Sequence, residues 1–234
     1  MKIRDAVVLV TGANRGLGRA WARLLLEAGA RKIYACARDP RSIDLPDVIP
    51  LELDITRAEQ VRRAAAECGD VTLLINNAGI VRGGALLDDE APERARQELD
   101  TNLFGTLAMC SAFAPILAAN GGGAIVNVLS VLSWISIPGG ATYSISKAAT
   151  WSMTNGVRIA VKDQGTLVVG VHVAFMDTDM TAGIDAPKAS PHDVVAQAIA
   201  ALEAGQEEVL ADALTRAVKQ GLSLERGVYL DAAG

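Results

Sequence analysis

The sequence predicts an α/β fold, a single doubly wound domain in which a central parallel β-sheet is flanked by helices. Short β-branched runs alternate with longer helical patterns along the 234 residues. The expected strands are almost wholly apolar, as parallel strands covered on both faces require, and the alternation implies right-handed crossovers. We find no linker or low-complexity tract, so residues 1–234 are expected to form one domain.

The first two elements set the pattern for the rest of the chain. Residues 6–11 are the first expected strand, and residues 15–30 form an amphipathic helix that carries Leu17 and Trp21 on its apolar face. Gly29 is placed to end this helix.

Later elements follow the same alternation. The remaining expected strands are residues 32–37, 48–54, 71–76, 124–130, 167–175 and 207–212. Two helix starts are marked locally, because Thr56 with Glu59 matches a capping box, whereas Ser190, Pro191 and Asp193 supply a cap, a first-turn proline and an acid.

The composition excludes several classes of protein. The net charge of -5 offers no basic footprint for nucleic acid or an anionic membrane. Cys36, Cys68 and Cys110 have no CxxC spacing, so neither a disulfide framework nor a metal site is expected, and a reduced cytoplasmic protein is implied. The uncharged block 101–146 is interrupted by Asn102, Gly105, Pro115 and the run 120–123, so we interpret it as a buried centre or subunit contact rather than a membrane span.

A glycine cluster, TGANRGLG, joins the first strand to the first helix at residues 11–18. Glycines at this point let the chain turn sharply and let backbone N–H groups approach a pyrophosphate, whose charge the helix N-terminus favours. A merely tight turn is the alternative interpretation.

The glycine cluster has the spacing TGxxxGxG, and NNAG at residues 76–79 and YSISK at residues 143–147 follow it in order. With these motifs the chain resembles the classical short-chain dehydrogenase/reductase family over about residues 7–180. The resemblance implies a Rossmann-type fold, an adenine contact at Asp54 and a nicotinamide carboxamide contact at Thr178. The cofactor-binding residues that it implies are Gly12, Asn14, Arg15, Gly16, Leu17, Gly18, Arg38, Asp54, Ile55, Asn77, Ala78, Gly79, Tyr143, Lys147 and Thr178.

Two arginines indicate which nicotinamide cofactor is preferred. An acid at the end of the second strand would bind the ribose hydroxyls of NAD, but Ala37 and Arg38 stand there. Arg38 and Arg15 together suit a 2′-phosphate, so NADP(H) is expected to be preferred over NAD(H). Asp39 leaves alternatives open, since it could pair with Arg38, contact a ribose or be a solvated surface charge.

Tyr143 and Lys147 stand four residues apart and so share one face of a helix. An unperturbed phenol ionises only near pH 10, and a neighbouring ammonium makes its anion more accessible. Lysine at the edge of an apolar block is otherwise a snorkelling surface residue. The family resemblance implies that Lys147 lowers the pKa of Tyr143 and binds the nicotinamide ribose.

Ser130 and Asn102 complete a catalytic tetrad with Tyr143 and Lys147 by the same resemblance. Ser130 would bind the substrate oxygen, with Ser133 as a nearby alternative, and Asn102 would hold a water that links the lysine to solvent. An asparagine that only satisfies neighbouring backbone is the other interpretation of Asn102. The implied reaction is hydride transfer to a carbonyl carbon, with Tyr143 as the general acid or base.

The chain departs from the family pattern after the sixth expected strand, where Val173 and Ala174 replace the usual Pro-Gly pair. His172 is interpreted as a strand residue rather than a base. A short irregular substrate lid is expected near residues 179–189. The candidate substrate-pocket residues are mostly apolar, and they are Trp134, Ile135, Ile137, Phe175 and Met180, with Arg82 as the only nearby charge.

The C-terminal tail, near residues 213–234, is also atypical, and it could cover a cleft or pack on a neighbouring subunit. The helix expected at residues 103–118 resembles a dimer-forming helix of the family, so a homodimer or homotetramer is expected. The resulting hypothesis is an NADPH-dependent, reversible reductase of a small or medium apolar ketone or aldehyde. An NADP-binding sensor or scaffold without catalysis is the alternative, and a sugar-nucleotide epimerase is disfavoured because few residues follow Thr178.

Overall fold

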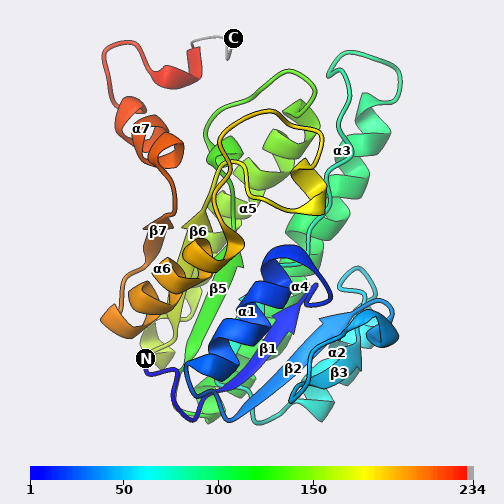
Figure 1. Cartoon of the computed structure of the whole chain (residues 1–234), viewed down its shortest axis with the longest axis vertical. Helices are drawn as coiled ribbons and strands as arrows, with labels where there is room; N and C mark the ends of the chain where they lie inside the picture. Colours follow the sequence, from blue (N-terminus) through cyan, green and yellow to red (C-terminus); the bar gives the residue numbers. More distant parts are fainter. Residues whose placement is uncertain (231–234) are drawn as a thin grey trace.

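The computed structural model describes residues 1–230 and contains one parallel sheet in the order β3-β2-β1-β4-β5-β6-β7 (Figure 1). The strands are β1 Val7–Thr11, β2 Lys32–Ala37, β3 Ile49–Glu52, β4 Leu73–Asn76, β5 Ala124–Val128, β6 Leu167–His172 and β7 Glu208–Leu210. The strand order reverses between β1 and β4, and such a switch point opens a crevice at the carboxyl ends of the strands.

Helices cover both faces of the sheet, which confirms the predicted α/β doubly wound class. The main helices are α1 Gly16–Glu27, α2 Ala58–Glu67, α3 Ala91–Leu99, α4 Thr106–Ala119, α5 Ala141–Ala160, α6 Pro191–Ala204 and α7 Ala213–Gly221. Helices α1 and α6 share one apolar cluster with the sheet, whereas α2, α4 and α5 share the cluster on the opposite face (Figure 1).

Strand β1 shows how an apolar run serves both faces. Val8 and Val10 belong to the cluster that contains Trp21 of α1, whereas Leu9 belongs to the cluster that contains Phe113 of α4. All of these side chains are fully buried. Because successive side chains in a strand alternate between faces, a central strand covered on both sides is apolar along nearly all of its length.

The three cysteines are buried and free, and burial raises the pKa of each thiol, that of Cys68 and Cys110 to about 12. Thiols that stay protonated at neutral pH are poor nucleophiles. Among residues 1–230, no cluster of three or more histidine, cysteine or acidic side chains could hold a metal ion.

Two predicted helix caps differ from the structure. Helix α2 begins at Ala58 after Arg57, and Thr56 donates its hydroxyl to Asp54 Oδ1 at 2.7 Å, so the predicted capping box of Thr56 and Glu59 is wrong. Helix α6 does begin at Pro191, although the Ser190 side chain makes no capping hydrogen bond. In the first case a local acceptor competes successfully for the hydroxyl.

A π-helical segment, Asp100–Gly105, joins α3 to α4 without a break. Gly105 lies so close to Ile55 that a Cβ would come within 2.7 Å of the isoleucine Cγ1. The helical run Ala91–Ala119 is long and apolar enough to cross a membrane, but the core helices of soluble proteins share these properties. Its α3 and α4 parts pack against α5. π-Helical turns often occur at functional sites, and this one holds Asn102.

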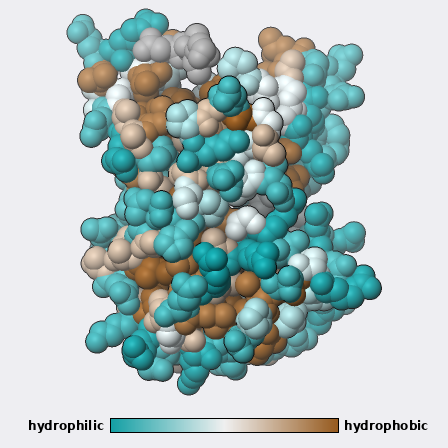
Figure 2. Space-filling model, viewed as in Figure 1, coloured by the Kyte–Doolittle hydropathy of each residue, from teal (hydrophilic) through white to brown (hydrophobic). Residues whose placement is uncertain are grey.

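The segment after β6 and residues 213–230 lie toward the upper end of the molecule in Figure 1. Ala189 donates its N–H to Phe175 at 2.8 Å and accepts from Asp177 at 3.0 Å, so the predicted irregular lid is tied at its base. Figure 2 shows apolar surface at both the upper and the lower end of the face that it draws. Among the large apolar side chains of the described residues, Leu87, Ile159 and Leu224 are the most exposed.

Candidate active site

The glycine turn leaves no room for side chains beneath it. Gly12 and Gly16 have φ values of 65° and 50°, which favour glycine. A Cβ on Gly18 would collide with the carbonyl oxygen of Gly12. The backbone at the start of α1 is therefore open to an approaching anion, as a helix N-terminus that binds pyrophosphate requires.

The NNAG segment is bonded directly to the glycine turn. Thr11 Oγ1 accepts the N–H groups of Asn77 and Ala78, each at 3.0 Å, and Asn77 Nδ2 donates to the carbonyl of Thr11 at 2.9 Å. Asn76 instead points into the core, where it donates to Asn127 Oδ1 at 2.9 Å. These bonds fix the ends of β1 and β4 on either side of the crevice.

A cavity of about 890 Å³ lies at the carboxyl ends of the strands. Its walls include every predicted cofactor-binding residue, from Gly12 to Thr178, and three of the four predicted tetrad residues, Ser130, Tyr143 and Lys147. Asn102 does not line it. The sequence motifs, which are spread over more than 160 positions, therefore converge on one space.

Tyr143 and Lys147 project from α5 into this cavity, and the lysine Nζ lies 5.6 Å from the centre of the tyrosine ring. Lys147 is buried and donates to the carbonyl of Val128 at 2.8 Å; burial lowers its pKa to about 8. The pKa of Tyr143 is raised, chiefly by burial and then by the charge of Glu98, while Ser130 acts in the opposite direction. In the free protein the phenol therefore stays protonated at neutral pH, and the predicted lowering of its pKa by Lys147 is wrong for this state because burial outweighs it.

Ser130 is held in one orientation at the end of β5. Its Oγ accepts the N–H of Leu132 at 3.1 Å, and its own N–H donates to Ser133 Oγ at 3.4 Å. A hydroxyl that accepts one hydrogen bond can still donate its hydrogen, and the hydrogen bond by which Ser130 lowers the pKa of Tyr143 shows that the hydroxyl lies beside the phenol. Ser133, the alternative, is buried and does not line the cavity.

Asn102 lies behind the cavity wall. Its Oδ1 accepts from the N–H of Ile80 at 2.8 Å, while its Nδ2 donates to the Ile80 carbonyl and to Ser146 Oγ, both at 2.9 Å. Its backbone carbonyl accepts the hydroxyl of Thr150 at 3.0 Å. The side chain thus satisfies neighbouring backbone and joins α5 to the loop after β4, whereas its predicted role with water stays a prediction.

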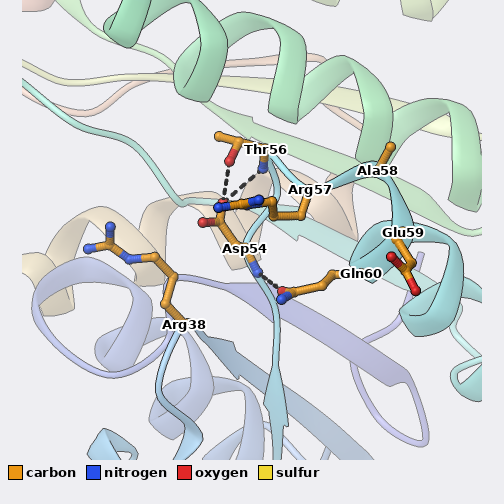
Figure 3. Close-up of a pocket in the computed structure, with 7 residues that line it drawn as sticks. All are labelled: Arg38, Asp54, Thr56, Arg57, Ala58, Glu59 and Gln60. Atoms are coloured by element: carbon orange, nitrogen blue, oxygen red, sulfur yellow. Dashed lines mark hydrogen bonds between the residues drawn. The ribbon is translucent and has the colours of Figure 1, made fainter.

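A second cavity, of about 460 Å³, adjoins the first at its outer end, and the two share Arg38, Asp54 and Thr56 (Figure 3). Arg38 makes no hydrogen bond or ion pair with any residue among 1–230. Arg57 also lines this second cavity, although no sequence motif singled it out. Two guanidinium groups therefore border the end of the crevice beside Asp54.

The other charges near this end are paired. Asp39 accepts two side-chain hydrogen bonds from Arg41, at 2.9 and 3.1 Å, and this partner lowers the pKa of the Asp39 carboxyl. Arg15 forms an exposed ion pair with Asp179 of the lid at 3.4 Å. Asp39 therefore pairs with Arg41 and not with Arg38. Arg15 pairs with Asp179, a partner that the sequence did not indicate and that would compete with a cofactor phosphate.

The outer walls of the large cavity are mostly apolar. Ile135, Ile137, Phe175 and Met180 line it, as does Arg82. Trp134 does not, so that part of the predicted pocket is wrong.

The reason is that the Trp134 ring stacks on His172 with the ring centres 4.0 Å apart. His172 itself is buried in β6, which confirms it as a strand residue.

The atypical tail contributes a further wall. Leu214 of α7 lines the cavity, and Asp212 before it accepts the N–H of Ala174 at 2.8 Å. Asp212 also accepts the N–H and the hydroxyl of Thr215, both at 2.8 Å, and so caps α7. Leu214 is the one residue of 213–230 that lines the cavity. Whether the rest of the tail covers the cleft or packs on a neighbouring subunit stays a prediction, and residues 231–234 of the tail lie outside the described part of the chain.

Glu98 is the main polar group near the site that sequence reasoning missed. Its carboxylate is fully buried, Oε1 accepts the N–H of Arg82 at 2.6 Å, and Oε2 has no hydrogen-bond partner among the described residues. Glu98 stands among several other charged residues in α3, so the pattern gave no sign that this one is buried.

The doubly wound sheet and the cavity at its switch point define a Rossmann-type protein. The family model described as short chain dehydrogenase matches residues 6–189. The chain belongs to the short-chain dehydrogenase family, a family of oxidoreductases.

Relatives and solved structures agree with this assignment. An uncharacterized oxidoreductase of Myxococcus xanthus is 35% identical over 187 residues, which are 74% of this chain and 73% of that protein. Dehydrogenase/reductase SDR family member 7B of Xenopus tropicalis is 33% identical over 76% of this chain and 63% of its own length. A short chain dehydrogenase of Burkholderia cenocepacia, solved in complex with NADP, is 44% identical with a TM-score of 0.92, over 97% of this chain and 96% of that one.

Proposed function

We propose that this chain is an NADPH-dependent carbonyl reductase that reduces a small or medium apolar ketone or aldehyde, reversibly, to an alcohol. The observation that carries the proposal is that Ser130, Tyr143 and Lys147 face one cavity whose outer wall is apolar. Polar groups confined to one end of an apolar pocket fix the orientation of a ligand. A carbonyl oxygen directed at those groups leaves its apolar substituents against the outer wall.

Tyr143, Ser130 and Lys147 have separate roles in the proposed reaction. A bound nicotinamide cofactor would supply the hydride. Tyr143, whose raised pKa keeps the phenol protonated, donates its proton to the carbonyl oxygen, while the Ser130 hydroxyl donates a hydrogen bond to the same oxygen. Lys147 stabilises the resulting phenolate, because its ammonium lies beside the ring.

The cofactor end of the cavity fits NADPH better than NADH. Arg38 is exposed at this end with no ion-pair partner among residues 1–230, and Arg57 borders the same end (Figure 3). The carboxylate that would bind ribose hydroxyls, Asp39, is held by Arg41. The NADP complex of the Burkholderia cenocepacia relative supports the same preference.

A homodimer or homotetramer in the cytoplasm is the assembly that we propose. Large apolar side chains are exposed on the π-helical turn before α4 and on α5, where Phe104, Ile145 and Ile159 are 56%, 45% and 78% exposed. Burying such side chains in a subunit contact is favourable. Light scattering measures the mass directly, and a monomer at micromolar concentration contradicts this part of the proposal.

The test is oxidation of NADPH and NADH at 340 nm against a panel of apolar ketones, aldehydes and diketones. Tyr143→Phe is the informative variant, and Tyr229→Phe, at an exposed tyrosine outside the cavity, is its control. Turnover is expected to fall at least about a hundredfold in the first variant only, with NADPH binding unchanged. Binding of both cofactors without turnover of any carbonyl would instead favour a sensor or scaffold.

A further inference from the structure

The backbone carbonyl of Ser130 is held by a histidine that the proposed chemistry does not use. His172 Nδ1 lies 3.1 Å from this carbonyl oxygen, which also accepts the N–H of Ser133 at 3.0 Å. A carbonyl oxygen can only accept, so the ring nitrogen must carry the hydrogen. The other nitrogen, Nε2, faces Glu208 Oε1 at 3.8 Å. The contact therefore requires a hydrogen on Nδ1, and because burial lowers the pKa of the ring to about 4, the ring is neutral at pH 7 with Nε2 unprotonated.

The ring that makes this contact has little freedom. His172 is 1% exposed and stacks on Trp134 with an interplanar angle of 19°. Trp134 follows directly after the short 3-10 turn Val131–Ser133 that Ser130 caps. The histidine therefore contacts this loop twice, once at the first residue through a hydrogen bond and once at the last through its face.

The stack is also joined to the atypical tail. Lys219 of α7 places Nζ 4.8 Å from the centre of the Trp134 ring and bonds Glu208 of β7 at 2.8 Å. A cation over an indole face is attracted to it. Glu208 thus lies between the lysine and the histidine, and a series of contacts runs from α7 through Trp134 and His172 to Ser130.

We propose that His172 is a positioning residue for carbonyl reduction: its Nδ1–H holds the Ser130 carbonyl, and thereby the Ser130 hydroxyl, while α7 supports the ring through Trp134. This inference rests on the proposed function, since Ser130 is its point of action. The Oγ of Ser130 is fixed by the N–H of Leu132, two residues along the same turn. A shift of the peptide after Ser130 would therefore move the hydroxyl away from the substrate oxygen.

Two substitutions separate the hydrogen bond from the stack. His172→Phe keeps a flat ring against Trp134 but has no N–H, whereas His172→Asn places a donor at the position of Nδ1 without a ring. Misplacement of a reacting group by a fraction of an ångström to 1 Å can cost up to about a hundredfold. We expect kcat to fall about tenfold in His172→Phe and to recover to within about threefold of the original protein in His172→Asn. The NADPH dissociation constant is expected to stay unchanged in both.

The Ser130→Ala background tests whether the effect passes through the serine. If His172 acts by positioning Ser130, His172→Phe causes no further loss of kcat once the hydroxyl is gone, because coupled residues are not additive. An equal loss in both backgrounds, or an unchanged kcat in His172→Phe, overturns the proposal. Failure of the unsubstituted protein to reduce any carbonyl overturns the proposed function instead, and with it this inference.

A measurement without catalysis tests the geometry itself. The sequence has only two histidines, so labelling with ¹⁵N-histidine gives two ring systems, and His192→Asn assigns them. A neutral His172 protonated at Nδ1 at pH 7 is the expected result, and protonation at Nε2 contradicts the proposal.

Should His172→Phe not fold, Lys219→Met removes the cation from Trp134 and leaves every bond to Ser130 in place. We expect kcat to fall about two- to threefold relative to Arg216→Met on the same helix. An equal kcat in these two variants overturns the part played by α7.

Discussion

Ala174 donates its backbone N–H to Asp212 Oδ2 at 2.8 Å, so the loop after β6 is bonded to the start of α7. The same carboxylate caps α7 through Thr215. Asp212→Ala is expected to destabilise the protein by about 2 kcal/mol, because a cap is lost and an N–H is left without its partner. It should also raise the KM for the carbonyl substrate by moving Leu214, while the NADPH affinity stays unchanged.

Urea unfolding measures the first effect and steady-state kinetics the second. Asp193→Ala, which removes an exposed acid from the first turn of α6, is the matched control and should cost less than about 0.5 kcal/mol. Equal stabilities of the two variants would show that the Asp212 contacts are unimportant.

Arg38 should decide between the two cofactors. Replacing it with alanine removes the guanidinium that faces the end of the crevice, and we expect the NADPH dissociation constant to rise at least about tenfold, close to 1.4 kcal/mol. NADH binding should not change, because NADH has no 2′-phosphate. Fluorescence titration measures both constants, with Arg62→Ala on the outside of α2 as control. Parallel weakening of both cofactors contradicts this assignment.

Gly18 and Gly156 give opposite predictions for the same substitution. A Cβ at Gly18 collides with the backbone of Gly12, so Gly18→Ala should cost about 1–3 kcal/mol and abolish tight NADPH binding. A Cβ at Gly156, in the middle of α5, meets nothing within 4 Å, so Gly156→Ala should stabilise by about 0.5–1 kcal/mol. Thermal unfolding with and without NADPH checks both, and a stabilised Gly18→Ala would show that the turn relaxes.

The stability of the protein should depend on pH through His172. Burial lowers the pKa of this ring from 6.5 to about 4, although Ser130 and Glu208 act in the opposite direction. Between these two values the unfolded chain binds more protons than the folded one, so stability falls as pH falls through this window. The loss attributable to His172 is at most about 3 kcal/mol by pH 4.

Urea unfolding at pH 7, 5.5 and 4.5 compares the original protein with His172→Asn, in which this contribution is absent. Carboxylates that titrate in the same range are common to both proteins and cancel. His192→Asn, at an exposed histidine, should behave like the original protein. Identical slopes for all three proteins would show that His172 is not held neutral.

The sheet and the cofactor end of the site were predictable because each depends on local chemistry. Apolar runs specify buried strands, and the glycines of residues 12–18 are required by backbone geometry that no other residue adopts as easily. Tyr143 and Lys147 were predictable because they share one helix face and follow the glycine turn and the NNAG segment in the order that the family resemblance requires. Each of these features depends on residues that are close together in the sequence.

The features that were missed depend on contacts between distant segments. Glu98 has the same surroundings in sequence as its solvated neighbours, and only the packing of α3 against α5 shows that it is buried. Trp134 was assigned to the pocket because apolar residues follow it, but His172 and Lys219 hold its ring elsewhere. Likewise, the pairing of Arg15 with Asp179 joins positions 164 residues apart.

The wall that Leu214 contributes comes from the part of the chain that is synthesised after every other element of the cavity. Residues 7–180, which carry the glycine turn, the tyrosine and the lysine, leave the ribosome first. The cofactor end of the cavity can therefore assemble before its last wall is complete. Because that wall is encoded apart from the glycine turn, the tyrosine and the lysine, its sequence can vary while those residues are left intact.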